Sequence, residues 1–157
     1  MSNTKKYNFI SGLPRSGSTL LSTILNQNPR FTAGISDPLA DFVKSKITAV
    51  NMNVGMADVV PDERLYDLMR ADFEAFYKDD TEVCFNTGRG WAADTHLLKQ
   101  LYPDFKMIIT VRSIPWILDS FEKLHRKNPL KIKPLYDHID WASAYERCHM
   151  LMGQYPD

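Results

Sequence analysis

The sequence has only two cysteines among its 157 residues, Cys84 and Cys148, and they lie far apart. It has no C-x-x-C pair and no histidine spacing typical of zinc, so neither a disulfide framework nor a metal site is indicated. We expect both thiols to be reduced, as in a cytoplasmic protein.

Net charge is lacking too, because 19 basic residues balance 19 acidic ones. This balance excludes a globally basic nucleic-acid-binding surface, so any anion site must be local.

Long apolar runs are also absent. The apolar segment that follows Lys5 and Lys6 has only the length of a strand, so we expect neither a signal peptide nor a membrane span. The chain is 44% hydrophobic and free of repeats, which suffices for one core. We therefore expect a single domain over residues 1–157, and homo-oligomerisation stays open.

The segment 9–21, FISGLPRSGSTLL, is the most informative part of the sequence. It predicts a strand, a tight turn around an anion, and a helix whose first N–H groups can bind an oxyanion. Gly12 and Gly17 have the spacing of the nucleotide-triphosphatase pattern G-x-x-x-x-G-K-[ST], but Ser18 stands in the lysine position. Because that lysine binds the terminal phosphates, its loss disfavours magnesium-dependent ATP or GTP chemistry. The cation of this turn is Arg15 instead.

Residues 14–19, Pro-Arg-Ser-Gly-Ser-Thr, resemble the 5′-phosphosulfate loop of sulfotransferases, most closely the bacterial and tyrosylprotein types, whose usual form is Pro-[Lys/Arg]-Ser-Gly-Thr-Thr. The family's sulfuryl donor is 3′-phosphoadenosine 5′-phosphosulfate (PAPS), and its chemistry requires no metal. The resemblance implies that Arg15 is catalytic, since its charge would stabilise the departing phosphate. The residues implied to bind the donor are Arg15, Ser16, Gly17, Ser18, Thr19 and Leu20.

A second motif occupies residues 107–121, MIITVRSIPWILDSF. An apolar β-branched run ends in Arg112, Pro115 suits a first helical turn, and Ser120 follows within that helix. This order resembles the family's 3′-phosphate site, where such an arginine and serine bind the 3′-phosphate of PAPS. The guanidinium of Arg112 suits this role because it can make two charge-assisted hydrogen bonds to phosphate. The spacing of Arg112 and Ser120 alone is a weak signal for a 3′-phosphate site, and the matching loop at residues 14–19 strengthens it.

The resemblance covers about residues 7–127, including residues 101–106, which are similar to the family's Leu-Phe-Pro-x-x-Lys-type turn. In the loop before that helix, relatives often carry a lysine beside the transferring sulfuryl group. Thr87 takes that position here if the loop aligns without a gap, and Arg89 is the catalytic candidate for the missing charge. The alternative is that Arg89 and Trp91 belong to a surface loop packed on a helix.

The sequence leaves three candidates for the catalytic base. In tyrosylprotein-type relatives a glutamate follows a glycine after the first helix, and Ile35 stands at that position here. Asp37 is the first candidate, and His96 and Asp94 rank behind it, His96 because cytosolic relatives use histidine. The alternative for Asp37 is a helix N-cap followed by Pro38 at the first helical position.

Strands are expected near 7–11, 82–86 and 106–111, and helices at 18–27, 37–50, 62–78, 93–101, 115–127 and 139–152. This alternation predicts an α/β fold, a three-layer sandwich with a mainly parallel sheet and a P-loop-like phosphate-binding turn. Because parallel strands end at one edge of the sheet, Arg15 and Arg112 should face the same nucleotide. The segment from Asn51 to Asp58 is expected to be a mobile connection, either an acceptor-side lid or an ordinary linker.

The leading hypothesis is a sulfotransferase that uses PAPS, releases PAP and modifies a hydroxyl or amine of an acceptor. The acceptor is not predicted, because its contacts lie in variable loops. A protein that binds PAPS or PAP without turnover is the first alternative, since the glutamate and the lysine are missing and typical relatives continue further past the 3′-phosphate helix. A P-loop small-molecule kinase is the second, and Ser18 argues against it.

Overall fold

The computed structural model describes residues 5–35, 38–79 and 81–127. Its sheet has the strand order β2-β3-β1-β4, and every neighbouring pair is parallel. The strands are β1 (Lys6–Gly12), β2 (Phe31–Ala33), β3 (Val83–Thr87) and β4 (Met107–Thr110). The helices are α1 (Ser18–Leu25), α2 (Leu39–Asn51), α3 (Val54–Val59), α4 (Asp62–Phe76), α5 (Thr95–Leu101) and α6 (Ile114–Lys127), with a 3-10 turn η1 (Trp91–Ala93).

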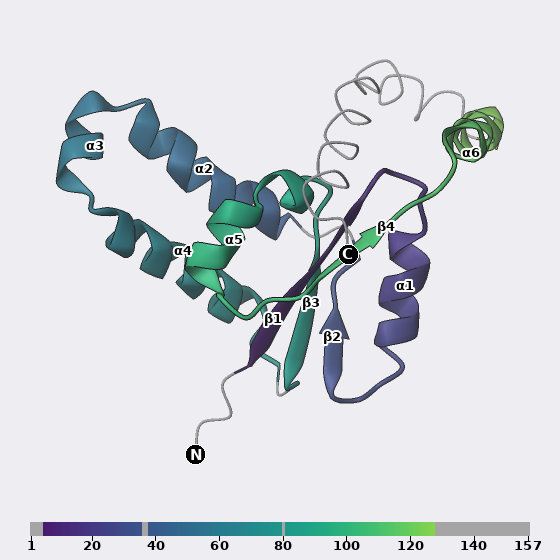
Figure 1. Cartoon of the computed structure of the whole chain (residues 1–157), viewed down its shortest axis with the longest axis horizontal. Coiled ribbons are helices and arrows are strands. Elements are labelled where there is room, and N and C mark those ends of the chain that lie inside the picture. Colours follow the sequence, from purple (N-terminus) through teal and green to yellow (C-terminus); the bar gives the residue numbers. More distant parts are fainter. Residues whose placement is uncertain (1–4, 36–37, 80, 128–157) are drawn as a thin grey trace.

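Two apolar cores lie on the two faces of the sheet. Phe9 of β1 is fully buried on one face, where its ring meets Phe73 of α4 and Trp91 of η1 at centroid distances of 5.8 and 5.3 Å. Ile10, the next residue, belongs to the other core and packs with Phe85 of β3. Successive residues of β1 are apolar because this inner strand is covered on both faces. Figure 1 shows α1 on one side of the sheet and α2, α4 and α5 on the other, which confirms the predicted three-layer α/β sandwich.

The short strand β2 has no counterpart among the predicted strands, because three residues are too few to show a periodicity. Its end is fixed by Asn26, whose side-chain amide donates to the Ala33 carbonyl at 2.9 Å and accepts from the Ala33 N–H at 2.6 Å. This side-chain contact and the parallel pairing with β3 keep β2 in the sheet.

The segment from Asn51 to Asp58 differs from the predicted connection, because Val54–Val59 forms helix α3. Gly55 lies inside this helix and lowers its intrinsic propensity, which conceals the helix in the sequence. The helix predicted at 139–152 lies outside the described residues. No helix within the described ranges is both long and apolar enough to cross a bilayer.

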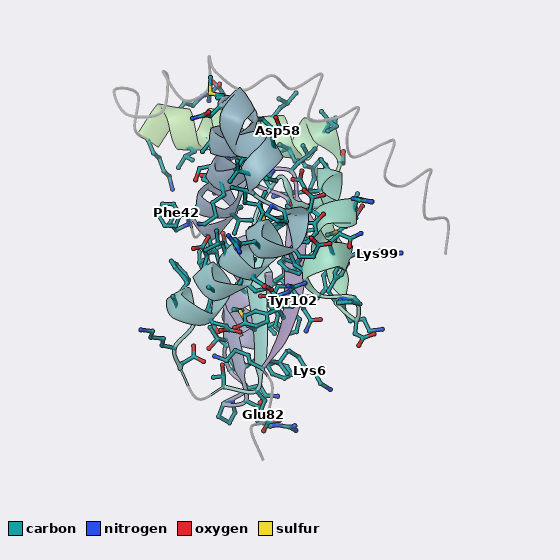
Figure 2. All side chains as sticks on the ribbon, turned by 90° about the vertical axis from the view of Figure 1, so that its left-hand side faces the viewer. Lys6, Phe42, Asp58, Glu82, Lys99 and Tyr102 are labelled. Atoms are coloured by element: carbon teal, nitrogen blue, oxygen red, sulfur yellow. The ribbon has the colours of Figure 1, made fainter. Side chains whose placement is uncertain are left out.

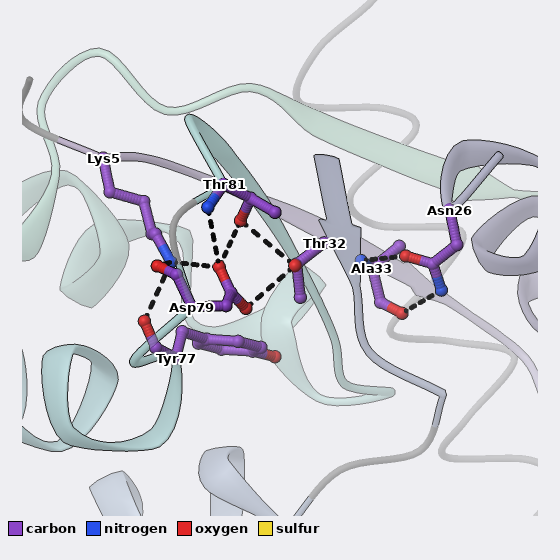
Figure 3. Close-up of polar contacts among 7 residues, drawn as sticks. All are labelled: Lys5, Asn26, Thr32, Ala33, Tyr77, Asp79 and Thr81. Carbon is purple, nitrogen blue, oxygen red and sulfur yellow. Dashed lines mark hydrogen bonds and ion pairs between the residues drawn. The ribbon is translucent and has the colours of Figure 1, made fainter. Parts of the chain in front are cut away.

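At the amino-terminal edge of the sheet, Asp79 collects hydrogen bonds from three segments (Figure 3). Lys5, which precedes β1, donates to Asp79 Oδ1 at 2.5 Å, and Thr32 of β2 donates to Oδ2 at 2.9 Å. Thr81, which precedes β3, donates to Oδ1 through its N–H at 3.1 Å and through its hydroxyl. Burial raises the pKa of Asp79, but the hydrogen bonds from Lys5, Thr81 and Thr32 together outweigh it and hold the pKa well below the usual range.

We expect Asp79→Asn to lower the free energy of unfolding by about 1 kcal/mol near neutral pH, a modest value because the carboxylate is partly exposed. The folded-state pKa is depressed, so this contribution is present above about pH 4 and is lost as the pH falls through the folded-state pKa. Urea unfolding should show that the difference in unfolding free energy between Asp79→Asn and wild type becomes smaller as the pH is lowered from about 7 to about 2. The matched control is Asp104→Asn, an exposed carboxylate without an ion pair in the described part of the chain. Equal destabilisation across the pH range would contradict this role of the Asp79 charge.

Candidate active site

The segment between β1 and α1, residues 13–17, forms a closed turn that we call the phosphate loop. The Ser16 N–H donates to the Leu13 carbonyl at 3.2 Å, with Pro14 and Arg15 between them. Arg15 has a φ of 66°, the left-handed conformation that a type II turn requires at its third residue. Proline suits the second position, whereas a non-glycine residue in the third costs about 1 kcal/mol. The loop therefore holds an arginine at its tip at some cost in backbone strain.

The start of α1 presents free backbone donors next to this turn. Gly17 is the N-cap residue, with a φ of 114° and no side-chain cap. The first hydrogen bond of the helix runs from the Leu21 N–H to the Gly17 carbonyl at 3.0 Å. Within the described residues, the N–H groups of Ser18, Thr19 and Leu20 therefore have no acceptor. Free N–H groups at the positive end of a helix form a site for an anion.

Arg15, Arg112 and Ser120, which we call the arginine cluster, come together at the carboxyl edge of β1 and β4. Arg15 donates from Nε to Ser120 Oγ at 2.9 Å, and Arg112 donates from Nη1 to the Arg15 carbonyl at 3.0 Å. The Arg112 guanidinium also lies over the Trp116 ring, 5.6 Å from its centroid. Figure 1 shows the loop after β1 beside the segment that leads from β4 to α6. The structure thus joins the two sequence motifs in one exposed, positively charged surface.

Gly12 and Thr110 are paired neighbours at the ends of β1 and β4. A Cβ atom at Gly12 would lie 2.4 Å from Thr110 Oγ1 and 2.5 Å from the Thr110 carbonyl oxygen. Gly12 also has a φ of 146°, which a side chain disfavours. The close approach of β4, as well as the turn, therefore requires glycine at this position.

The loop after β3 lies at the same edge of the sheet. The Ser11 hydroxyl donates to the Arg89 carbonyl at 3.0 Å, which places Arg89, an exposed residue, beside the carboxyl end of β1. Thr87 is buried, and its Oγ1 lies 3.1 Å from Ser22 Oγ of α1. The Thr87 side chain thus points into the fold and contacts α1.

The alternative of a surface loop packed on a helix holds for Trp91 only in part, because its ring packs against Phe73 of α4 but is not on the surface. The ring is fully buried, and its Nε1 donates to Asn86 Oδ1 at 2.5 Å. Asn86 in turn donates to the Tyr77 hydroxyl at 2.8 Å. Lys44 of α2 lies over the Trp91 ring at 5.8 Å and pairs with Asp94. Sequence reasoning missed Lys44, because nothing in the sequence of α2 marks which lysine faces this loop.

His96 is exposed at the start of α5 and lines a hollow of about 320 Å³. Its neighbours there include Asn51, Asp62 and Tyr66, and none of the lining residues belongs to the phosphate loop or the arginine cluster. Figure 2 looks onto this layer of helices, from which the labelled side chains of Phe42 and Lys99 project on opposite sides. The structure does not bring His96 into contact with the residues predicted to bind the donor.

Asp37 lies outside the described residues, so its role as a base stays a prediction. Ile35, the position that the resemblance assigns to the glutamate, is 51% exposed. Helix α2 begins at Leu39 with Pro38 as the N-cap residue, one position later than the alternative predicts. The alternative role of Asp37 as a helix N-cap falls on the same undescribed residue and also stays a prediction.

Comparison with known families identifies one match. The family model described as the Sulfotransferase family matches residues 9–156. No curated protein matches the chain. The matched range includes the phosphate loop and the arginine cluster.

Proposed function

The chain belongs to the sulfotransferase family, and we propose that it transfers the sulfuryl group of PAPS to a hydroxyl or amine of an acceptor and releases PAP. Family membership supports sulfuryl transfer in general. PAPS as the donor is supported by one observation, the arginine cluster beside the free N–H groups of α1. This arrangement offers anion ligands from two motifs, as a nucleotide with a 5′-phosphosulfate and a 3′-phosphate requires.

The described residues use only part of the donor capacity of this cluster. A guanidinium has five N–H donors, and Arg15 uses Nε on Ser120 while Arg112 uses Nη1 on the Arg15 carbonyl. Ser120 accepts from Arg15, so its own hydroxyl proton can be donated to a phosphate oxygen. In our proposal Arg112 and Ser120 hold the 3′-phosphate. Arg15 and the first N–H groups of α1 hold the 5′-phosphate side.

PAPS supplies an activated sulfuryl group attached to a phosphate leaving group. As the acceptor attacks in line, the fixed charge of Arg15 and the N–H groups of α1 stabilise the negative charge that grows on that phosphate. The turn and the helix start hold these donors in place before the reaction, so they need not reorganise. The acceptor must also lose a proton, for which Asp37 and His96 are the candidate bases. Arg89 is the candidate cation on the acceptor side.

Turnover with PAPS tests this proposal. The purified chain is incubated with PAPS and a panel of hydroxyl and amine acceptors, and the release of PAP is measured. Release that depends on the acceptor is the expected result. Failure of the chain to bind PAP or PAPS would contradict the proposal.

Binding of PAPS or PAP without turnover is a second candidate function. It is favoured by Thr87, which takes the family's lysine position if the loop aligns without a gap, because this side chain is buried and hydrogen-bonded to Ser22. If the chain has this function, it binds PAP but no acceptor in the panel releases PAP from PAPS.

We expect Asp37→Asn to reduce the turnover rate by about 100-fold or more while leaving PAP affinity unchanged, because a general base contributes about that much to the rate. His96→Gln is expected to change the rate by less than about twofold, since its hollow contains no residue of the phosphate loop. Initial rates of PAP release with the best acceptor measure both effects. A wild-type rate in Asp37→Asn together with a large loss in His96→Gln would transfer the role to His96.

A further inference from the structure

The side chain of Thr110, the last residue of β4, is hydrogen-bonded to the phosphate loop. Thr110 Oγ1 lies 2.6 Å from Ser16 Oγ and 3.2 Å from the Ser11 carbonyl oxygen. Ser16 Oγ in turn lies 2.5 Å from the Leu13 carbonyl oxygen. These contacts connect the end of β1, the first residue of the turn and the end of β4. Thr110 lies within the second sequence motif, but nothing in that motif indicates this contact.

A count of protons limits what these hydroxyl groups can do. Thr110 and Ser16 carry one hydroxyl proton each, and three short contacts compete for the two protons. The two shortest contacts are satisfied together when Thr110 donates to Ser16 and Ser16 donates to the Leu13 carbonyl. The Ser16 N–H also donates to the Leu13 carbonyl, at 3.2 Å. Both donors of Ser16 are thus used to close the turn that carries Arg15.

The ends of β1 and β4 lie so close together at Gly12 and Thr110 that Thr110 cannot move toward β1. A Cβ at Gly12 would lie 2.4 Å from Thr110 Oγ1 and 3.1 Å from Ser16 Oγ. The three residues therefore form one tight contact between β1, β4 and the loop. Packing of this kind holds side chains in single rotamers, so that the Ser16 hydroxyl stays on the turn.

We propose that Thr110 is a positioning residue for donor binding. Its hydroxyl holds Ser16, and Ser16 holds the turn that places Arg15 and the first N–H groups of α1. In this account the side chain of Ser16 shapes the loop and makes no hydrogen bond to the donor. The proposal rests on the proposed function, because it assigns the loop to PAP and PAPS.

Two variants of Thr110 separate the hydroxyl from the shape of the side chain. Thr110→Val keeps the volume and removes the hydroxyl, whereas Thr110→Ser keeps the hydroxyl and removes a methyl group. We expect Thr110→Val to weaken PAP binding about five- to tenfold in isothermal titration, the loss of one hydrogen bond, and Thr110→Ser to stay within about twofold of wild type. Ser16→Ala should weaken binding similarly, and the double variant Thr110→Val with Ser16→Ala should bind no more weakly than the weaker single variant. Equal affinities for Thr110→Val and wild type, or an equal loss in Thr110→Ser, would overturn the proposal.

Hydrogen exchange keeps this test distinct from that of the proposed function. If the wild-type chain fails to bind PAP, the proposed function fails, and the positioning role is then judged on the ligand-free protein. The Ser16 amide, which is hydrogen-bonded to Leu13, should exchange about tenfold faster in Thr110→Val than in Thr110→Ser. Equal exchange rates in the two variants would overturn the role of the Thr110 hydroxyl.

Discussion

Replacing Gly12 with alanine is expected to lower the free energy of unfolding by about 3 kcal/mol and to abolish PAP binding. The new methyl group would lie 2.4 Å from Thr110 Oγ1 and 2.5 Å from the Thr110 carbonyl oxygen, well inside van der Waals contact. The φ of 146° adds backbone strain that alanine cannot relieve. Either β4 must move away from β1 or the phosphate loop must distort, and both changes separate Arg15 from Arg112. Urea unfolding and titration with PAP measure the two effects.

Gly17→Ala is the matched control for stability. A Cβ at Gly17 meets no atom within 4 Å, so this variant carries only the strain of its φ of 114°. We expect it to cost about 1–2 kcal/mol. If Gly12→Ala were as stable as Gly17→Ala, the close approach of β4 to Gly12 would be contradicted.

Removing either guanidinium of the arginine cluster is expected to weaken PAP binding by about 10- to 100-fold, which corresponds to the loss of one charge-assisted hydrogen bond. Arg15→Gly is the sharper variant at the loop, because glycine adopts the φ of 66° without strain and the turn is kept. Arg112→Ala removes the other guanidinium. Ser120→Ala should weaken binding less, since it removes a neutral donor.

Arg64→Ala is the control for charge, because it removes one exposed positive charge from α4, in the helix layer that covers the opposite face of the sheet from α1. Isothermal titration of each variant with PAP gives the affinities, and urea unfolding shows that the variants are folded. Arg15→Gly should be as stable as wild type while binding PAP poorly. Wild-type affinity in both Arg15→Gly and Arg112→Ala would contradict the assignment of the arginine cluster to the donor.

The main elements of the fold could be predicted because their signals are local. The glycines and hydroxyl residues of segment 9–21 mark the turn between β1 and α1, and apolar runs mark the inner strands. The short strand β2 could not be predicted, since it depends on its pairing with β3 and on the side chain of Asn26. Helix α3 could not be predicted because Gly55 weakens its local signal.

The meeting of Arg15 and Arg112 at one edge could be predicted, because parallel strands place their carboxyl ends together. Two other contacts could not be predicted: the hydrogen bond between Thr87 and Ser22, and the contact of Thr110 with the phosphate loop. Each depends on how two segments that are distant in sequence pack together. These are the contacts that decide which hydroxyl groups remain free for a ligand.

Isothermal titration of the wild-type chain with PAP, 5′-AMP and magnesium ATP tests the central claim most directly, because PAP and 5′-AMP differ only in the 3′-phosphate. Our account predicts that PAP binds at least about tenfold more tightly than 5′-AMP, the effect of a 3′-phosphate held by Arg112 and Ser120. A preference for magnesium ATP would favour the P-loop kinase instead. Equal affinity for PAP and 5′-AMP, or no binding of PAP, would contradict the account.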